Sequence, residues 1–116
     1  MPRTRTLLIE TLDSLRDPDK WNGTPDYQHG QNCIVTALFN RCVHYSVGRD
    51  VSGARARKHI RAAIAEHGVP DGCMNSRGFP DIINWNDHPT TKHADVIKVL
   101  RDAANRASWP WEKVAA

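Results

Sequence analysis

Residues 32–43, which read NCIVTALFNRCV, carry apolar side chains around most of a helical circumference. Asn32 is a residue type that caps helix N-termini, so the stretch predicts a helix that begins at Cys33. A helix that is apolar on most sides is typical of a protein interior. We therefore expect this helix at the centre of the fold. Its end is left open, because residues 43–47 also alternate as a short strand would.

Three amphipathic helices are predicted around this segment, over residues 3–16, 52–67 and 92–107. In each of them apolar residues recur at helical spacing, which places them on one face. The inward-facing residues are Leu8, Leu12 and Leu15; Ala56, Ile60, Ala63 and Ile64; and Val96, Leu100, Ala103 and Ala107. The predicted boundaries are Pro18 after the first helix, Ser52 and Gly68 around the second, and Thr90 or Thr91 as the cap of the third.

A short helix is expected before the last one, because Pro80 suits a first helical turn and apolar residues follow at 82–85. His88-Pro89 closes it. The sequence thus predicts an all-α fold of four main helices and one short helix, joined by long polar loops. At 116 residues the chain is expected to form a single domain over residues 1–116, with residues 108–116 as an aromatic C-terminal tail.

Composition and cysteine content exclude several classes of protein. With 40% hydrophobic and 25% charged residues, the chain is ordinary for a globular domain. Its apolar stretches are far shorter than the roughly 20 residues of a membrane span, and the N-terminus lacks a signal-peptide core. We therefore expect a cytoplasmic protein without a membrane partner. Cys33, Cys42 and Cys73 match no disulfide framework or paired metal-binding motif, so we expect reduced thiols, no metal and no cofactor.

The net charge of +3 is unevenly distributed along the chain. Residues 41–68 contribute +4 and the rest of the chain −1. The basic segment follows an apolar helix, as in a helix-turn-helix protein that would contact DNA through four side chains, Arg55, Arg57, Lys58 and Arg61. The connecting turn is longer than that motif uses, and the modest total charge favours a solvated helix face instead.

Cys33 is the best candidate for a catalytic residue. It begins a helix, whose dipole stabilises a thiolate, and residues 28–33 are similar in order to the Gln-to-Cys segment of papain-like proteases. His88 or His93 would have to act as the base, but the papain-like fold supplies that histidine from a β-sheet. This sequence predicts no sheet. We therefore expect no catalytic residue and interpret Cys33 as a small core residue.

Residues 85–87, Trp-Asn-Asp, combine an aromatic wall with two polar side chains, which suits a polar binding site. Asn and Asp before His-Pro are also typical of turns and caps. We favour the structural interpretation. In it, Trp85 packs against the central helix, while Asn86 and Asp87 tie the loop to the first turn of the final helix.

The remaining tryptophans and Tyr27 are candidates for contact with a partner. Trp21 and Tyr27 lie in a polar segment, residues 17–31, which is long for a loop in a compact domain. Trp109 and Trp111 lie beyond the last helix and need not be core residues. Because tryptophan is frequent in binding hot spots, these four residues are the predicted partner-binding set. The two C-terminal tryptophans either fold back over the first helix or bind a partner or a second copy of the chain.

Segments spread over most of the chain carry a family resemblance. They are Leu15-Arg16-Asp17-Pro18 followed by Trp21, Cys33 to Leu38, Ile83 to Asp87, and Thr91 followed by Asp95-Val96-Ile97. In these segments the sequence resembles a family of small uncharacterised proteins from actinobacteria and their phages, catalogued as domain of unknown function 6197. That family has no assigned activity. The resemblance implies a small phage or actinobacterial protein.

Phage proteins of this size often bind and redirect a host protein, so the resemblance implies a non-enzymatic role. We expect the chain to bind a host protein, or to form a homo-oligomer, through the Trp21 loop, the aromatic tail or the basic helix. A DNA-binding regulator is the first alternative. A cysteine hydrolase is the second.

Overall fold

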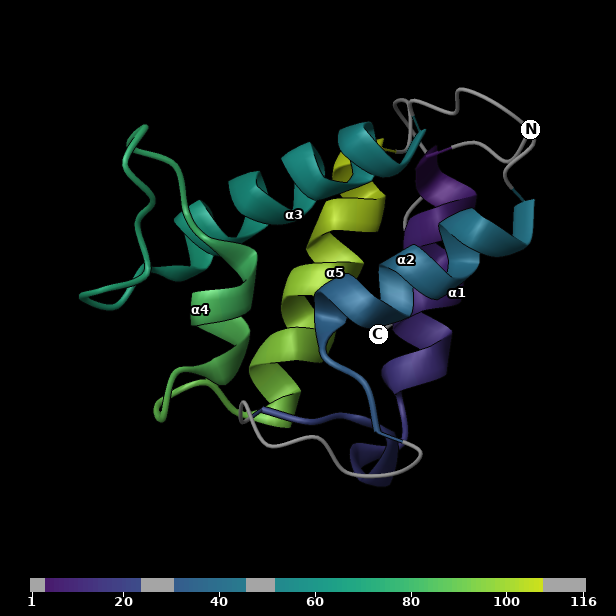
Figure 1. The fold of residues 1–116 in the computed structure, drawn as a ribbon, viewed down its shortest axis with the longest axis horizontal. Coiled ribbons are helices and arrows are strands. Elements are labelled where there is room, and N and C mark those ends of the chain that lie inside the picture. The colour runs from purple at the N-terminus through teal and green to yellow at the C-terminus, as the bar shows by residue number, and fades with distance from the viewer. Residues whose placement is uncertain (1–3, 24–30, 46–51, 108–116) are drawn as a thin grey trace.

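The computed structural model describes residues 4–23, 31–45 and 52–107, and Figure 1 shows how the helices in these ranges are arranged. The elements are α1 (Thr4–Leu15), the short 3-10 helix η1 (Pro18–Lys20), α2 (Ile34–Tyr45), α3 (Ser52–His67), α4 (Ile82–Asp87) and α5 (His93–Ala107). The described part of the chain contains no strand. The prediction of an all-α fold with four main helices and one short helix is confirmed. The predicted tail, residues 108–116, lies outside the described residues.

Helix α5 lies at the centre of the molecule, with α3 on one side and α1 on the other (Figure 1). Its buried face consists of Val96, Val99, Leu100, Ala103 and Ala104. The two alanines are small, which lets the neighbouring helices approach closely near the end of α5. Each fully buried valine or leucine contributes about 1.5–3 kcal/mol relative to an exposed one. The last helix in sequence therefore organises the core.

The prediction that the helix starting at Cys33 lies at the centre is wrong. Helix α2 packs on α1 and touches α3 and α4, at the edge of the assembly. It buries Ile34 and Leu38, but Phe39, the next residue, is 63% exposed. Apolar residues around the whole of α2 thus form two faces, one turned to the core and one turned outward. Residues 43–45, which the sequence leaves undecided between helix and strand, are helical, because α2 continues through Tyr45.

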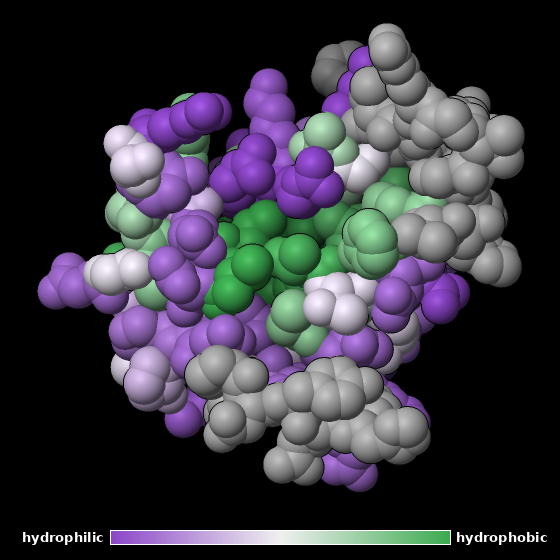
Figure 2. Space-filling model, viewed as in Figure 1, coloured by the Kyte–Doolittle hydropathy of each residue, from purple (hydrophilic) through white to green (hydrophobic). Residues whose placement is uncertain are grey.

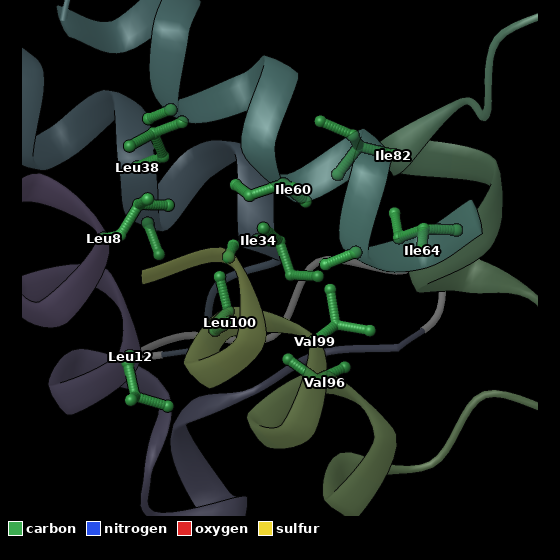
Figure 3. Close-up of a cluster of buried hydrophobic side chains, with 14 of the residues drawn as sticks. Leu8, Leu12, Ile34, Leu38, Ile60, Ile64, Ile82, Val96, Val99 and Leu100 are labelled. Atoms are coloured by element: carbon green, nitrogen blue, oxygen red, sulfur yellow. The ribbon is translucent and has the colours of Figure 1, made fainter. Parts of the chain in front are cut away.

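Helices α1 and α3 supply the walls of the core on either side of α5 (Figure 3). The residues predicted to face inward are buried in both: Leu8, Leu12 and Leu15 in α1, and Ala56, Ile60, Ala63 and Ile64 in α3. Gly68 follows α3 with a φ of +112°, and its N–H donates to the Ile64 carbonyl at 3.0 Å. A left-handed glycine just after a helix is a common stop, as the sequence predicts.

The N-terminus of α2 is capped by Cys33, one residue after the predicted cap. The Thr36 N–H donates to the Cys33 Sγ at 3.4 Å, so the sulfur takes the place of a capping oxygen. Asn32 is engaged elsewhere, since its backbone N–H donates to the Lys20 carbonyl at 2.8 Å and its carbonyl accepts from Asn22 at 3.0 Å. These two bonds hold the segment before α2 against the segment after η1.

Helices α4 and α5 also begin slightly later than predicted. Asp81 caps α4 by accepting the Asn84 N–H at 3.0 Å. In α5 the Asp95 carboxylate reaches back to accept the Lys92 N–H at 2.8 Å, which is one arm of a capping box. The sequence predicts Pro80 in the first turn of the short helix and Thr90 or Thr91 as the cap of the last one, and all three lie just before the observed helices.

Asn86 is fully buried and uses both ends of its side-chain amide. Its Oδ1 accepts the Trp21 indole N–H at 2.8 Å and the Ile34 backbone N–H at 3.1 Å. Its Nδ2 donates to the Asn22 carbonyl and to Asp87 Oδ1, both at 2.9 Å. Asn86 has a structural role, as predicted, but its contacts differ from the predicted ones. The sequence suggests that Asn86 contacts the first turn of the final helix, whereas its side chain joins α4 to the start of α2.

Trp85, the neighbour of Asn86, is 1% exposed. Its ring meets the ring of His67 edge-on, with centroids 6.0 Å apart and planes at 87°. The ring contact is with the end of α3, and Trp85 also belongs to the buried cluster that includes Ile34 and Leu38 of α2. Trp85 and Asn86 together fix a helix of six residues to both of its neighbours.

Replacing Asn86 with Leu is expected to lower the free energy of unfolding by about 3 kcal/mol or more, because two buried groups and the part-buried Trp21 indole N–H lose their partners at about 1–3 kcal/mol each. Urea unfolding followed by circular dichroism measures this loss. Asn84→Leu is the matched control, since Asn84 lies exposed on the same short helix. Equal losses in the two variants would contradict the role given to the Asn86 amide.

Candidate functional site

The basic residues predicted on α3 divide into two pairs that line different hollows. Arg57 and Arg61 are one helical turn apart and line a hollow of about 220 Å³ between α3, α2 and α4. Arg55 and Lys58 line another hollow, next to the end of α5. Three of the four are exposed and Arg61 is half-buried. The helix therefore presents two basic surfaces, which adjoin at a third hollow that Lys58 and Arg61 both line.

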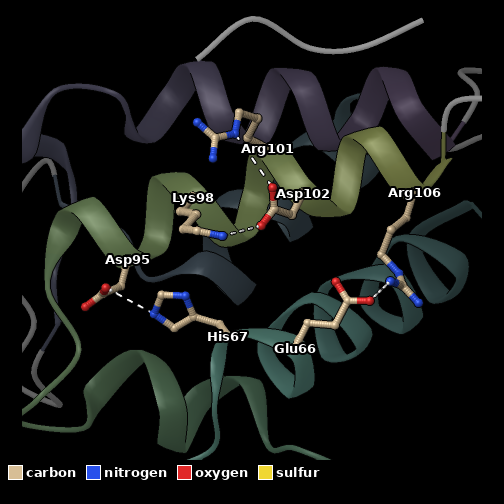
Figure 4. A network of polar contacts seen from close by, with 7 residues as sticks. All are labelled: Glu66, His67, Asp95, Lys98, Arg101, Asp102 and Arg106. Atoms are coloured by element: carbon tan, nitrogen blue, oxygen red, sulfur yellow. Dashed lines mark hydrogen bonds and ion pairs between the residues drawn. The ribbon is translucent and has the colours of Figure 1, made fainter. Parts of the chain in front are cut away.

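These four basic residues differ from the other charged residues nearby. On the side of α3 and α5 drawn in Figure 4, charges pair with each other, as in Lys98–Asp102 at 2.9 Å and His67–Asp95 at 3.1 Å. No carboxylate in the described ranges forms an ion pair with any of the four basic residues. Their charge is thus available to an acidic partner.

Large apolar side chains lie exposed on α2, on α4 and just before α4, the elements that border the hollow of Arg57 and Arg61. Phe39 on α2 is 63% exposed, Ile83 on α4 is 50% exposed, and Phe79, just before α4, is 55% exposed. Figure 2 shows a hollow with hydrophobic side chains at its floor and hydrophilic side chains along its border. We define the α2–α4 face by the residues Val35, Arg57, Arg61 and Ile83, which line the smaller hollow, and Phe79, which lines its neighbour. Exposed Phe39, one turn along α2 from Val35, is included with them.

The α2–α4 face has a positive local charge. Asp81 also lines the smaller hollow, but its carboxylate is already engaged in capping α4. Arg61 reaches both this hollow and a neighbouring one of about 430 Å³ that includes Phe79 and Lys58. A ligand that covers the apolar floor would exclude water from the two arginines and strengthen any charge pairing with them. The face suits a ligand that is apolar on one side and acidic at its edges.

The predicted partner residue Trp21 is engaged within the fold. It is half-buried, its indole N–H is bonded to Asn86, and its ring lies 6.0 Å from that of His93. The backbone passes so close that a Cβ on Gly23 would clash with the Trp21 ring. The ring therefore holds the segment in place. The other three predicted partner residues lie outside the described residues: Tyr27, Trp109 and Trp111.

Sequence reasoning missed the apolar part of the face. Phe39 was assigned to a buried helix, yet it follows Leu38 and so lies about 100° around the helix from it. Val35 and Phe39, four positions apart, form a stripe separate from the buried one of Ile34 and Leu38. Ile83 repeats the pattern in α4, where Ile82 is buried and Ile83 is not. The second apolar stripe on α2 is the sequence feature that could have predicted an exposed apolar surface.

The thiol of Cys33 has local partners. Its Sγ lies 3.3 Å from the Thr36 hydroxyl and accepts the Thr36 N–H. His93, one of the two proposed bases, lies with its Nε2 2.6 Å from the Leu15 carbonyl, and His88 bonds a threonine two residues further along. Within the described ranges neither histidine is hydrogen-bonded to Cys33. In the described part of the chain, the three residues of the cysteine-hydrolase alternative therefore share no hydrogen-bond network.

Two further findings concern the described residues as a whole. No three of their His, Cys, Asp and Glu side chains converge in a way that could hold a metal ion. None of the helices within these ranges combines the length and apolar character that a membrane crossing requires.

The fold and this face define a small all-α protein with a mixed basic and apolar surface. The chain belongs to a family of unknown function, DUF6197, whose model matches residues 1–106. The family resemblance seen in the sequence is confirmed. Comparison with curated proteins and with solved structures gives no match.

The three cysteines are expected to differ in reactivity. Burial, and next the charge of Asp81, raise the pKa of the Cys73 thiol, so Cys73 should stay unmodified in the folded protein under iodoacetamide. Cys33 is half-buried and should react first. Peptide mass spectrometry after short exposures measures the order. In concentrated urea the difference should vanish, and a folded protein in which Cys73 reacts before Cys33 would contradict the placement of the two thiols.

Proposed function

We propose that this protein acts by binding another protein, and that the α2–α4 face binds an amphipathic, acidic segment of that partner. The observation that supports this most is the exposure of Ile83 next to Arg57 and Arg61. Exposed Phe39 lies one turn along α2 from Val35, which lines the same hollow. Large apolar side chains exposed to water are energetically unfavourable, and a binding partner that covers them removes this cost. The two arginines favour a partner with acidic side chains.

The energetics favour a segment that covers several residues at once. Burial of one large apolar side chain contributes about 1.5–3 kcal/mol to binding. The loss of translational and rotational freedom on association offsets a contribution of this size. Binding therefore requires Phe39, Ile83 and Phe79 to be covered together. An amphipathic helix laid along a groove does this with residues one turn apart. Acidic residues at its edge would meet Arg57 and Arg61.

The partner is proposed to be a protein of the bacterial host, in the cytoplasm. This part of the proposal rests on the family resemblance, which implies a small phage or actinobacterial protein. A second copy of the chain could not use the acidic side chains on the outer side of α5, because Asp95 is paired with His67 and Asp102 with Lys98. A host partner with an acidic, amphipathic segment would meet both the apolar and the basic side chains of the face.

DNA binding stays the alternative prediction. The four basic residues of α3, which have no ion pair within the described ranges, would suit phosphates. The apolar side chain of Ile83, exposed beside Arg57 and Arg61, would gain nothing from a phosphate backbone. Six residues, 46–51, connect α2 to α3, whereas a helix-turn-helix uses three or four. The cysteine hydrolase gains no support from the contacts of Cys33.

Photo-crosslinking in an actinobacterial host tests the proposal. A benzoylphenylalanine placed at Phe39, or separately at Ile83, should trap the same host protein, whereas the probe at exposed Thr6 on α1 should not. Arg61→Glu should abolish the adduct and weaken binding of the purified partner at least about tenfold, as expected for a reversed charge in a desolvated contact. Arg55→Glu, the same change on the other side of the same helix, should retain both.

Three outcomes would contradict the proposal. Adducts that are equal at Phe39, Ile83 and Thr6 would mean that the face has no special role. Equal loss in Arg55→Glu and Arg61→Glu would mean that general charge, not the α2–α4 face, governs binding. Crosslinks to nucleic acid would favour the DNA-binding alternative.

A further inference from the structure

A second hollow, of about 520 Å³, lies between α3 and the last turn of α5. Most of the side chains around it are cationic or can become so. Its lining consists of Arg55, Lys58, His59, Ala62 and Arg106. Two helices far apart in sequence thus bring four nitrogen-bearing side chains to one concave site.

The positive charge of this hollow is poorly compensated. Arg55 and Lys58 have no carboxylate partner in the described part of the chain. Arg106 has one, Glu66, at 2.5 Å, but the Glu66 side chain is 65% exposed and is not among the lining residues. Burial and the nearby charges of Arg106 and Lys58 lower the pKa of His59, because a further positive charge is disfavoured there.

We infer that this hollow binds a small phosphorylated ligand. Guanidinium groups bind phosphate oxygens through two parallel hydrogen bonds, and Arg55 and Arg106 approach the hollow from different helices. The Lys58 ammonium adds a point charge, and His59 donates a hydrogen bond once it is protonated. The volume falls in the range of small-molecule sites and exceeds that of a bare phosphate.

This inference is independent of the proposed protein-binding function. Arg55 and Lys58 face the end of α5, whereas Arg57 and Arg61 face α2 and α4. Lys58 is at the border, since it also lines the hollow that contains Phe79. Loss of one function therefore leaves the other measurable, and Arg55 and Arg57 give matched variants for telling the two surfaces apart.

Binding of pyrophosphate to the full-length protein tests the site, with the His59 imidazole signals in NMR as a local reporter. Pyrophosphate should produce a saturable shift and raise the pKa of His59, because an anion offsets Arg55, Lys58 and Arg106. Arg55→Gln and Arg106→Gln should each weaken binding about tenfold, as expected for the loss of a charged hydrogen bond. Arg57→Gln, which removes the same charge from the neighbouring surface, should leave binding unchanged.

Two further arms make the outcome decisive. Inorganic phosphate should bind more weakly than pyrophosphate, since it fills less of the hollow. The affinity of short duplex DNA, counted per phosphate group, should be no higher than that of pyrophosphate. Tight DNA binding that is weakened equally by Arg55→Gln and Arg57→Gln would overturn the inference. A His59 shift that grows linearly without saturation, or an equal effect of Arg57→Gln on pyrophosphate, would also overturn it. Circular dichroism of each variant verifies that the helices are intact.

Discussion

The buried amide of Asn86 is the contact on which the arrangement of this protein depends. It accepts the first N–H of α2 at 3.1 Å and the indole of Trp21 at 2.8 Å, and it lies on a helix of only six residues. A helix that short has no stability of its own in water, so its place is set by tertiary contacts. Because α4 carries Ile83 and α2 carries Phe39, the amide that joins these helices also creates the surface proposed to bind a partner.

The helices and their inward faces could be predicted from the sequence, because helical periodicity is a local property. Leu8, Leu12 and Leu15, and Ile60 and Ile64, are buried as their spacing indicates. Which helix lies at the centre was not predictable from periodicity. The apolar circumference of α2 suggested a core helix, whereas α5, with one apolar face, occupies the centre. An apolar side chain can face a core or an exposed groove, and only the neighbouring helices decide which.

The candidate sites were predictable in charge but not in geometry. Uneven charge along the chain pointed to Arg55, Arg57, Lys58 and Arg61, and all four are on the surface of α3. Their division into two surfaces depends on residues distant in sequence, since Arg106 closes one hollow and Ile83 the other. The contact of Trp21 within the fold was unpredictable for the same reason, because Asn86, which accepts its indole N–H, lies 65 positions away.

The face held together by Asn86 is proposed to be the binding surface. An NMR titration of the full-length protein with the purified host protein identified by crosslinking, followed on methyl and indole N–H signals, checks this. The methyl groups of Val35 and Ile83 should shift on binding, while those of Val99, buried on α5, should not. Shifts confined to the indoles of Trp109 and Trp111, with Val35 and Ile83 unchanged, would contradict it.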